Sequence, residues 1–154
     1  MSVWGIFAHI ESGEPVVVGV RVNGPRGSLT GKEVFRHRSS PNDDWSQKLR
    51  ALTAHLETAL KQDTPDALVV RSLDYSPATR REEVARRRYQ VEGAILAAAR
   101  RHVEIVDSRS GRELGALCGS KKAAVLAEAA AAFGDELQDA GAAAIGALVL
   151  AGQA

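Results

Sequence analysis

Two stretches in the last third of the chain decide the fold: Gly115-Ala-Leu-Cys-Gly-Ser-Lys-Lys122 and Asp135-Glu-Leu-Gln-Asp-Ala-Gly-Ala-Ala-Ala-Ile-Gly-Ala147. The first reads as a glycine-bounded turn that carries paired lysines, and an alanine-rich segment follows it. The second begins with acidic residues and continues with small ones. We therefore predict a helix that Ser120 caps and that runs to Phe133, and a final helix from about Glu136 to Ala151.

The first 35 residues have the pattern of three strands. An apolar run at 3–9 and a β-branched run at 16–22 are followed by a more polar run at 29–35, with glycine and proline turns between them. β-branched residues fit strands better than helices. Three strands joined by short turns predict an antiparallel meander.

The middle of the chain alternates helices and strands. Ser40-Pro41-Asn42-Asp43 is typical of a helix start, and leucines at helical spacing follow it. Residues 66–72 form a short continuous apolar run, as in strands buried on both faces. Ser76-Pro77-Ala78-Thr79 predicts a second helix to about Arg101. A strand at 102–107 and a turn or short helix at 111–119 complete the series.

This order of elements predicts one α/β domain over residues 1–154. A meander followed by right-handed crossovers gives a five-stranded mixed sheet, in the order 3-2-1-4-5, with helices on both faces. Glycines inside helices, at Gly93, Gly141 and Gly146, mark close packing or a homodimer contact.

Composition gives little information about partners, because the net charge is +1. The single cysteine, Cys118, cannot form an intramolecular disulfide, and we expect it to act as a small buried hydrophobe. The N-terminus has no basic segment before its apolar run, and the C-terminal helix is too rich in alanine for a membrane span. We predict a cytoplasmic protein, and the abundance of Ala, Arg and Gly suggests a bacterial genome of high G+C content.

Five short segments, in this order of elements, carry a resemblance to a known family: Ala67-Leu-Val-Val, Tyr89-Gln-Val-Glu-Gly-Ala-Ile-Leu-Ala-Ala, Val103-Glu-Ile-Val, Gly119-Ser-Lys-Lys-Ala-Ala-Val and Glu136-Leu-Gln-Asp-Ala. The chain resembles the RuvC-type Holliday-junction resolvases of the ribonuclease-H-like superfamily. The resemblance implies that fold. It also implies a site in which carboxylates hold two Mg²⁺ ions about 4 Å apart. These acids come from the first strand, the end of the fourth strand and the start of the last helix.

The sequence departs from that carboxylate pattern. Glu136 and Asp139 match the last pair by their spacing. The first strand has Phe7 or Ala8 where an acid belongs, and the fourth ends with Arg71, whose guanidinium would repel Mg²⁺. Compensation would have to come from Glu11 or Asp74, which both lie a few residues away, and it would need a shifted strand register.

Basic residues gather on the predicted second helix, where seven arginines stand against three glutamates. Guanidinium groups match phosphate geometry, and lysines at a helix N-terminus lie where the helix dipole favours an anion. The other interpretation is a solvated helix face with intrahelical ion pairs. The residues that we predict to contact nucleic acid are Arg80, Arg81, Arg87, Arg88, Lys121 and Lys122.

Three hypotheses follow. The first is a catalytically degenerate RuvC-like domain that binds structured DNA or RNA and needs no cofactor. The second is a divergent Mg²⁺- or Mn²⁺-dependent nuclease that uses Glu136, Asp139, Asp74 and Glu11, with Glu136 and Asp139 as metal ligands. The third is a protein-interaction module that uses its small-residue C-terminal helix as a docking or homodimer surface.

Overall fold

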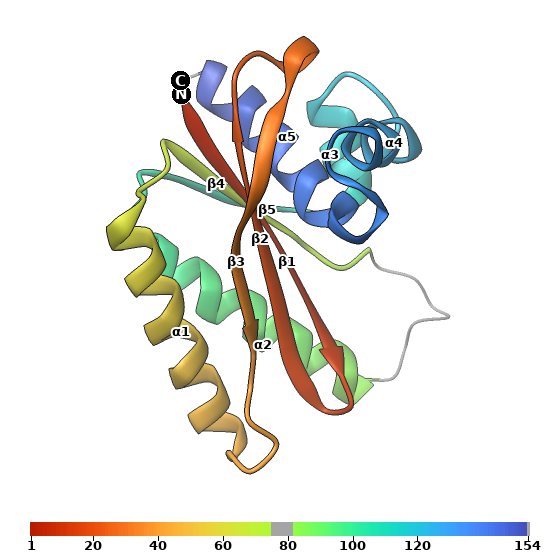
Figure 1. Ribbon diagram of the computed structural model, residues 1–154. Helices are drawn as coiled ribbons and strands as arrows, with labels where there is room; N and C mark the ends of the chain where they lie inside the picture. The colour runs from red at the N-terminus through yellow and green to blue at the C-terminus, as the bar shows by residue number, and fades with distance from the viewer. Residues whose placement is uncertain (75–81, 154) are drawn as a thin grey trace.

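The computed structural model describes residues 1–74 and 82–153. It contains a five-stranded mixed sheet in the order β3-β2-β1-β4-β5, which confirms the predicted fold class and strand order (Figure 1). Strands β1, β2 and β3 form an antiparallel meander, and β4 and β5 run parallel to β1. The strands span β1 Ser2–Glu11, β2 Glu14–Asn23, β3 Thr30–Arg38, β4 Ala67–Arg71 and β5 Ile105–Arg109.

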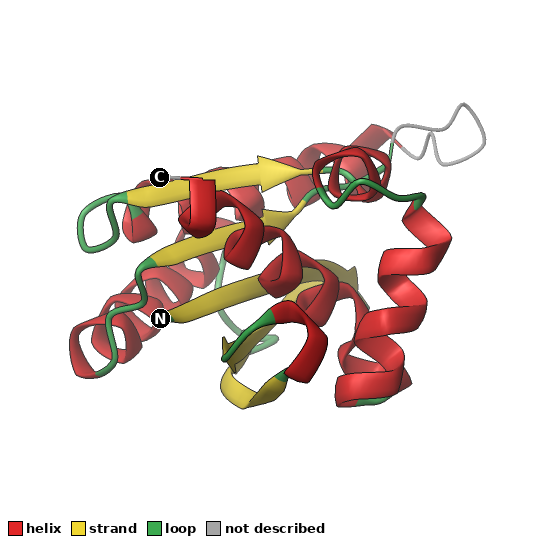
Figure 2. Cartoon of the chain, turned by 90° about the horizontal axis from the view of Figure 1, so that it is seen from above, coloured by secondary structure: helices red, strands yellow, loops and turns green. Residues whose placement is uncertain are grey.

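Helices cover both faces of the sheet, as predicted (Figures 1 and 2). Helices α1 and α2 pack on one face, and α3, α4 and α5 pack on the other. The helices span α1 Trp45–Gln62, α2 Glu82–Ala99, α3 Gly111–Leu117, α4 Lys122–Phe133 and α5 Gln138–Gln153. Within the part of the chain that the structure describes, none of these helices combines the length and the apolar character that crossing a bilayer requires.

Strand β1 contributes side chains to the cores on both faces of the sheet. Val3 belongs to the cluster under α5, whereas Trp4 and Ile6 belong to the cluster under α1 and α2, because successive strand side chains point to opposite faces. Gly5 points at α5, and a Cβ there would lie 2.0 Å from the carbonyl oxygen of Ala140. The backbone of α5 therefore packs directly on β1.

The small residues of α5 serve this internal packing. All eight residues from Ala140 to Ala147 are buried. Gly141 lies against Phe133 of α4, and Gly146 lies against Leu114 of α3, which confirms close helix packing at these two glycines. These eight residues therefore face the interior, whereas residues 148–151 are only partly buried, and docking through the C-terminal helix stays a prediction. For Gly93 close packing within the chain is wrong, because the position of its missing Cβ has no heavy atom within 4 Å among the described residues, and the homodimer contact stays a prediction.

Several helix ends differ from the predicted ones. Helix α1 begins at Trp45 rather than near Ser40, because Asp44 caps it in a reciprocal pair of hydrogen bonds with Gln47. Helix α4 begins at Lys122, and its N-cap Lys121 makes no side-chain capping bond, so Ser120 does not cap it. The predicted start at Ser76–Thr79 lies outside the described residues.

The start of the last helix also differs. Residues Asp135–Leu137 form a separate 3-10 turn, and α5 begins only at Gln138. Glu136 therefore lies outside the helix that carries Asp139. By contrast, Cys118 is buried as predicted, and burial raises the pKa of its thiol.

Candidate functional site

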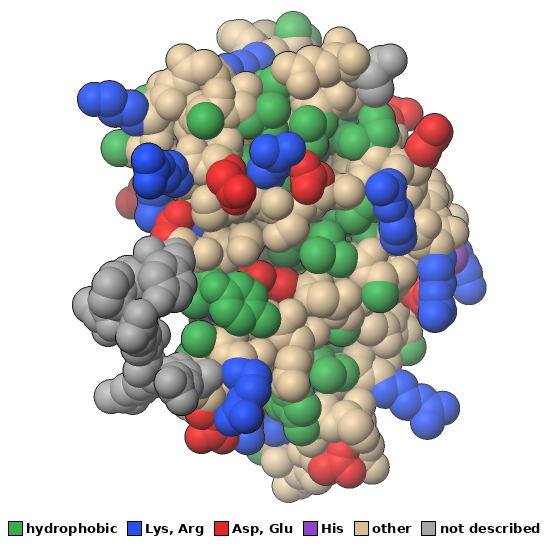
Figure 3. Space-filling model, turned by 180° about the vertical axis from the view of Figure 1, so that it is seen from behind, with side chains coloured by type: hydrophobic (Ala, Val, Ile, Leu, Met, Phe, Trp, Pro, Cys, Tyr) green, Lys and Arg blue, Asp and Glu red, His purple; other side chains and the backbone are tan. Residues whose placement is uncertain are grey.

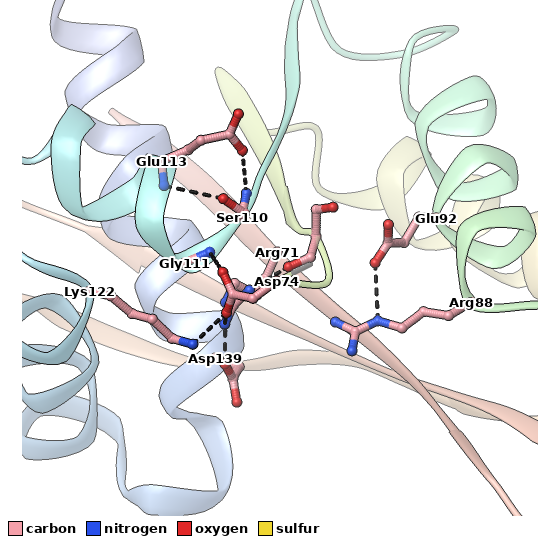
Figure 4. A network of polar contacts seen from close by, with 10 residues as sticks. Arg71, Asp74, Arg88, Glu92, Ser110, Gly111, Glu113, Lys122 and Asp139 are labelled. Atoms are coloured by element: carbon pink, nitrogen blue, oxygen red, sulfur yellow. Dashed lines mark hydrogen bonds and ion pairs between the residues drawn. The ribbon is translucent and has the colours of Figure 1, made fainter. Parts of the chain in front are cut away.

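A pocket of about 390 Å³ opens where β4 ends. In the parallel pairing of β1 and β4, Phe7 lies opposite Arg71, so both positions that depart from the carboxylate pattern meet here. Residues from five segments converge on this place (Figure 4). The pocket is lined by Phe7, Arg71, Leu73, Asp74, Arg88, Lys122 and Asp139.

Arg71 is the central residue of the pocket, and it is only 5% exposed. Its Nη1 donates to the carbonyl oxygen of Ser72, and its Nη2 donates to Asp74 Oδ2 at 2.8 Å. Its Nε lies 3.3 Å from Asp139 Oδ1, in an ion pair. Figure 4 shows Arg71 between the two carboxylates. A buried guanidinium needs such partners, because an uncompensated buried charge costs several kcal/mol, roughly 3–5.

Asp74 ties three elements together. Its Oδ1 accepts a hydrogen bond from the N–H of Gly111 at 2.9 Å, and its Oδ2 accepts from Arg71 and from Lys122. Burial raises the pKa of this carboxyl, but the hydrogen bonds and charges of Lys122 and Arg71 outweigh burial and lower the pKa to about 2. Asp74 is therefore ionised at neutral pH, and it links the end of β4 to α3 and α4.

Gly111 fits this site because it has no side chain. A Cβ on Gly111 would lie 2.8 Å from Arg71 Nη2 and 2.8 Å from Lys122 Cε. Ser110 caps α3 in a reciprocal pair with Glu113, which places the N–H of Gly111 toward Asp74. Sequence reasoning missed Gly111. The available signal was a glycine in the first turn of a helix that directly follows a strand.

Arg88 forms another wall of the pocket. Its guanidinium lies 5.0 Å from the centre of the Phe7 ring, and its Nε donates to Glu92 Oε1 at 3.1 Å. Burial raises the pKa of Glu92 above its usual value, although the charge and hydrogen bond of Arg88 and hydrogen bonds from Leu73 and Ser72 oppose this effect. The Arg88 side chain is only 12% exposed, so it faces the pocket more than bulk solvent.

The other predicted basic residues have mixed surroundings. Arg87 pairs with Glu83 at 3.1 Å and lies over the ring of Trp45, so part of its charge is compensated within the helix. Lys121 is exposed at the N-terminus of α4, and Lys122 reaches into the pocket. Arg80 and Arg81 lie outside the described residues.

The structure brings together two of the four predicted carboxylates. Asp74 and Asp139 meet at Arg71. Glu11 lies four residues beyond Phe7 on β1, where it pairs with Arg38 at 3.2 Å, and it does not line the pocket. Glu136 is exposed in the turn before α5 and does not line it either. Over the described ranges, no group of three or more His, Cys, Asp or Glu side chains has a metal-binding arrangement.

Three solved structures are similar to this chain along almost its whole length. Thermus thermophilus RuvC has 20% sequence identity and a TM-score of 0.71, and the match covers 99% of this chain and 96% of that one. The T. thermophilus RuvC complex with Holliday junction substrate has 20% identity, a TM-score of 0.67 and the same coverage. The yeast mitochondrial Holliday junction resolvase Ydc2 has 13% identity and a TM-score of 0.61, with 98% and 79% covered.

These matches show that the chain has a RuvC-like fold, as the resemblance in sequence implied. No protein-family model matches the sequence, and no curated protein sequence matches it. The similarity to known proteins is therefore one of structure. A shared fold does not determine an activity, which depends on the residues of the site.

Proposed function

We propose that this chain is a RuvC-fold domain that binds nucleic acid, either structured DNA or RNA, without cutting it. The observation that carries the proposal is the buried guanidinium of Arg71 between Asp74 and Asp139. The positive charge of this guanidinium lies at the position where metal-dependent cleavage would need bound metal cations.

The residues of the site do not fit a pair of Mg²⁺ or Mn²⁺ ions. Mg²⁺ prefers near-octahedral oxygen ligands at about 2.0–2.1 Å, and two-metal hydrolysis needs two such ions about 3.5–4 Å apart. Phe7 offers no oxygen, and Arg71 adds a positive charge. Both oxygens of Asp74 already accept hydrogen bonds. This donor set supports binding without metal-assisted hydrolysis.

The distribution of basic residues supports nucleic acid as the partner. Lys121 and Lys122 at the start of α4, together with Arg88 of α2, lie at or beside the pocket. On the face seen in Figure 3, lysines and arginines are spread out, and several lie beside acidic side chains. With a net charge of only +1, affinity would have to come from local contacts of these basic side chains with phosphate groups rather than from the charge of the whole chain.

Electrophoretic mobility shift with a four-way junction, single-stranded DNA and a structured RNA tests the proposal, with and without Mg²⁺ or Mn²⁺. We expect binding at low salt that weakens steeply as salt rises, because phosphate contacts release counterions, and no cleavage products. Absence of binding to all three probes at low salt would refute the binding part. Metal-dependent cleavage that disappears in Asp139→Asn would instead favour the nuclease hypothesis.

A further inference from the structure

We infer that the pocket at Arg71 is a receptor for a phosphodiester group of a nucleic-acid strand, held directly by Arg71, Lys122 and Arg88 without a bridging metal. This inference rests on the proposed function and names the chemical group that the site would bind. Three observations lead to it: the hydrogen-bond donors that Arg71 and Lys122 keep free, the N-terminus of α4, and the shape of the pocket.

Arg71 and Lys122 keep hydrogen-bond donors free in the pocket. A guanidinium has five N–H groups, but among the described residues Arg71 makes only two side-chain hydrogen bonds, and its buried Nε meets Asp139 Oδ1 at 3.3 Å in an ion pair without a hydrogen bond. Lys122 has three N–H groups and donates one of them to Asp74. Asp74 already accepts through both oxygens. A ligand rich in acceptor oxygens would satisfy these donors, and phosphate oxygens are strong acceptors.

The N-terminus of α4 lies beside the pocket. Lys122 is the first residue of this 12-residue helix, and no side chain caps its start. The first N–H groups of a helix have no intrahelical partner, and together with the helix dipole they favour negative charge. This field supplements the positive side chains. Helix α5 does not add to it in the same way, because the N–H of its first residue, Gln138, bonds to the carbonyl oxygen of Asp135.

The paired charges around the pocket limit the charge of its ligand. Arg71 and Lys122 lie against Asp74 and Asp139, while Arg88 is paired with Glu92. Because these side-chain charges nearly balance, a doubly charged terminal phosphate would leave more negative charge uncompensated than a singly charged phosphodiester.

The shape of the pocket suits a group that enters from solvent. Arg71 is buried within the pocket, whereas the Lys122 side chain is 44% exposed and can meet an incoming strand. Phe7 and Leu73 supply apolar wall, which matches the carbon atoms of a sugar next to the phosphate. A pocket with a charged buried group and apolar sides therefore fits a backbone unit of a nucleic-acid strand.

Lys122→Gln is the decisive variant, because this side chain is exposed enough for the fold to tolerate its replacement. Lys61→Gln is the matched control, since it makes the same change on α1, on the opposite face of the sheet. Fluorescence anisotropy with single-stranded and four-way-junction DNA over a salt series provides the readout. We expect Lys122→Gln to weaken binding roughly five- to tenfold near 0.1 M salt and to reduce the salt slope by about one.

Lys61→Gln should change affinity less than about twofold. If both variants lost the same affinity for DNA, the pocket would not be the phosphate site, because equal losses would indicate a general effect of charge. Arg71→Lys adds a second test, since it keeps the charge and loses the planar fork. We expect it to weaken binding at least as much as Lys122→Gln, with its folding checked by thermal melting.

A second experiment separates failure of the pocket from failure of the proposed function. In an NMR titration, the dinucleotide dTpdT, which carries one phosphodiester, should shift the Arg71 Nε–H and Gly111 amide signals more than inorganic phosphate does. If the long DNA probes do not bind but dTpdT produces these shifts, the proposed function fails and the pocket stands. If the DNA binds but neither signal moves with dTpdT, the pocket is overturned and the proposed function stands.

Discussion

The two faces of the sheet are packed in different ways. Under α1 and α2 the core consists of large side chains, among them Trp4, Leu52 and Leu56, which keep the helices at a distance from the strands. Under α5 the contact runs from backbone to backbone, at Gly5 and Ala140. Large side chains can change rotamers and absorb small shifts, whereas touching backbones cannot. The face with α5 therefore holds its helix in a narrowly defined position. Most of the candidate site lies at the edge of that face, and Arg88 joins it from α2 on the other face.

Gly5→Ala should have the largest effect, because it breaks this backbone contact. The new Cβ would lie 2.0 Å from the Ala140 carbonyl oxygen and 2.1 Å from the Ala144 nitrogen, so α5 would have to move away from β1. We expect the free energy of unfolding to fall by roughly 3 kcal/mol. Urea denaturation followed by circular dichroism measures it.

Gly27→Ala is the control for this substitution, since a Cβ there would meet no described heavy atom within 4 Å. Its stability should stay within about 0.5 kcal/mol of the wild type. If Gly5→Ala were equally harmless, α5 would not be held by β1. The position of Asp139 beside Arg71 would then need another explanation.

The same contrast explains how much of the fold could be predicted. The alternation in β1 and the continuous apolar run of β4 are local patterns, and they identify the strands and their order. Helix ends depend on which of several neighbouring polar residues forms the cap. Asp44 caps α1 although Ser40 and Asp43 offered similar chemistry. The glycine contacts under α5 depend on packing between segments far apart in the chain.

The candidate site was only half visible in the sequence for a related reason. Phe7 and Arg71 could be recognised as departures from a carboxylate pattern, because that pattern is tied to strand positions. The partners of Arg71 could not be read in this way. Asp139 lies 68 positions from Arg71, and Gly111 lies 37 positions from Asp74. Only the packing of α3, α4 and α5 on the sheet brings these residues together.

Asp74→Asn should have the next largest effect, because the α5 face is held at its edge by charged groups as well as by packing. The pKa of Asp74 falls from its usual 3.8 to about 2, since the hydrogen bonds and charges of Lys122 and Arg71 outweigh the effect of burial. An acid whose pKa is lowered by folding adds stability above its unfolded pKa and loses it as pH falls through the folded value. We therefore expect a loss of about 2 kcal/mol at pH 7.

The difference between the Asp74→Asn variant and the wild type should shrink as pH falls from about 4 to 2, and denaturation at several pH values measures it. Asp63→Asn is the control, because Asp63 pairs with Arg21 at 2.6 Å but its side chain is 38% exposed. An exposed pair of this kind contributes only about 0–1 kcal/mol. A pH-independent loss in Asp74→Asn would mean that Asp74 acts through its shape rather than its charge.

Gly93→Ala should have the smallest effect, and its sign should be opposite. Gly93 lies within α2, and the space where its Cβ would point is open among the described residues, so alanine removes backbone freedom from the unfolded chain without a clash. We expect a gain of up to about 1 kcal/mol. The same change at Gly141 of α5 would place a Cβ 2.6 Å from Phe133 Cδ2 and should destabilise the protein. If Gly93→Ala instead destabilises the protein, and the loss grows with protein concentration, a second chain packs on α2. The contrast between the two faces would then hold only for the monomer.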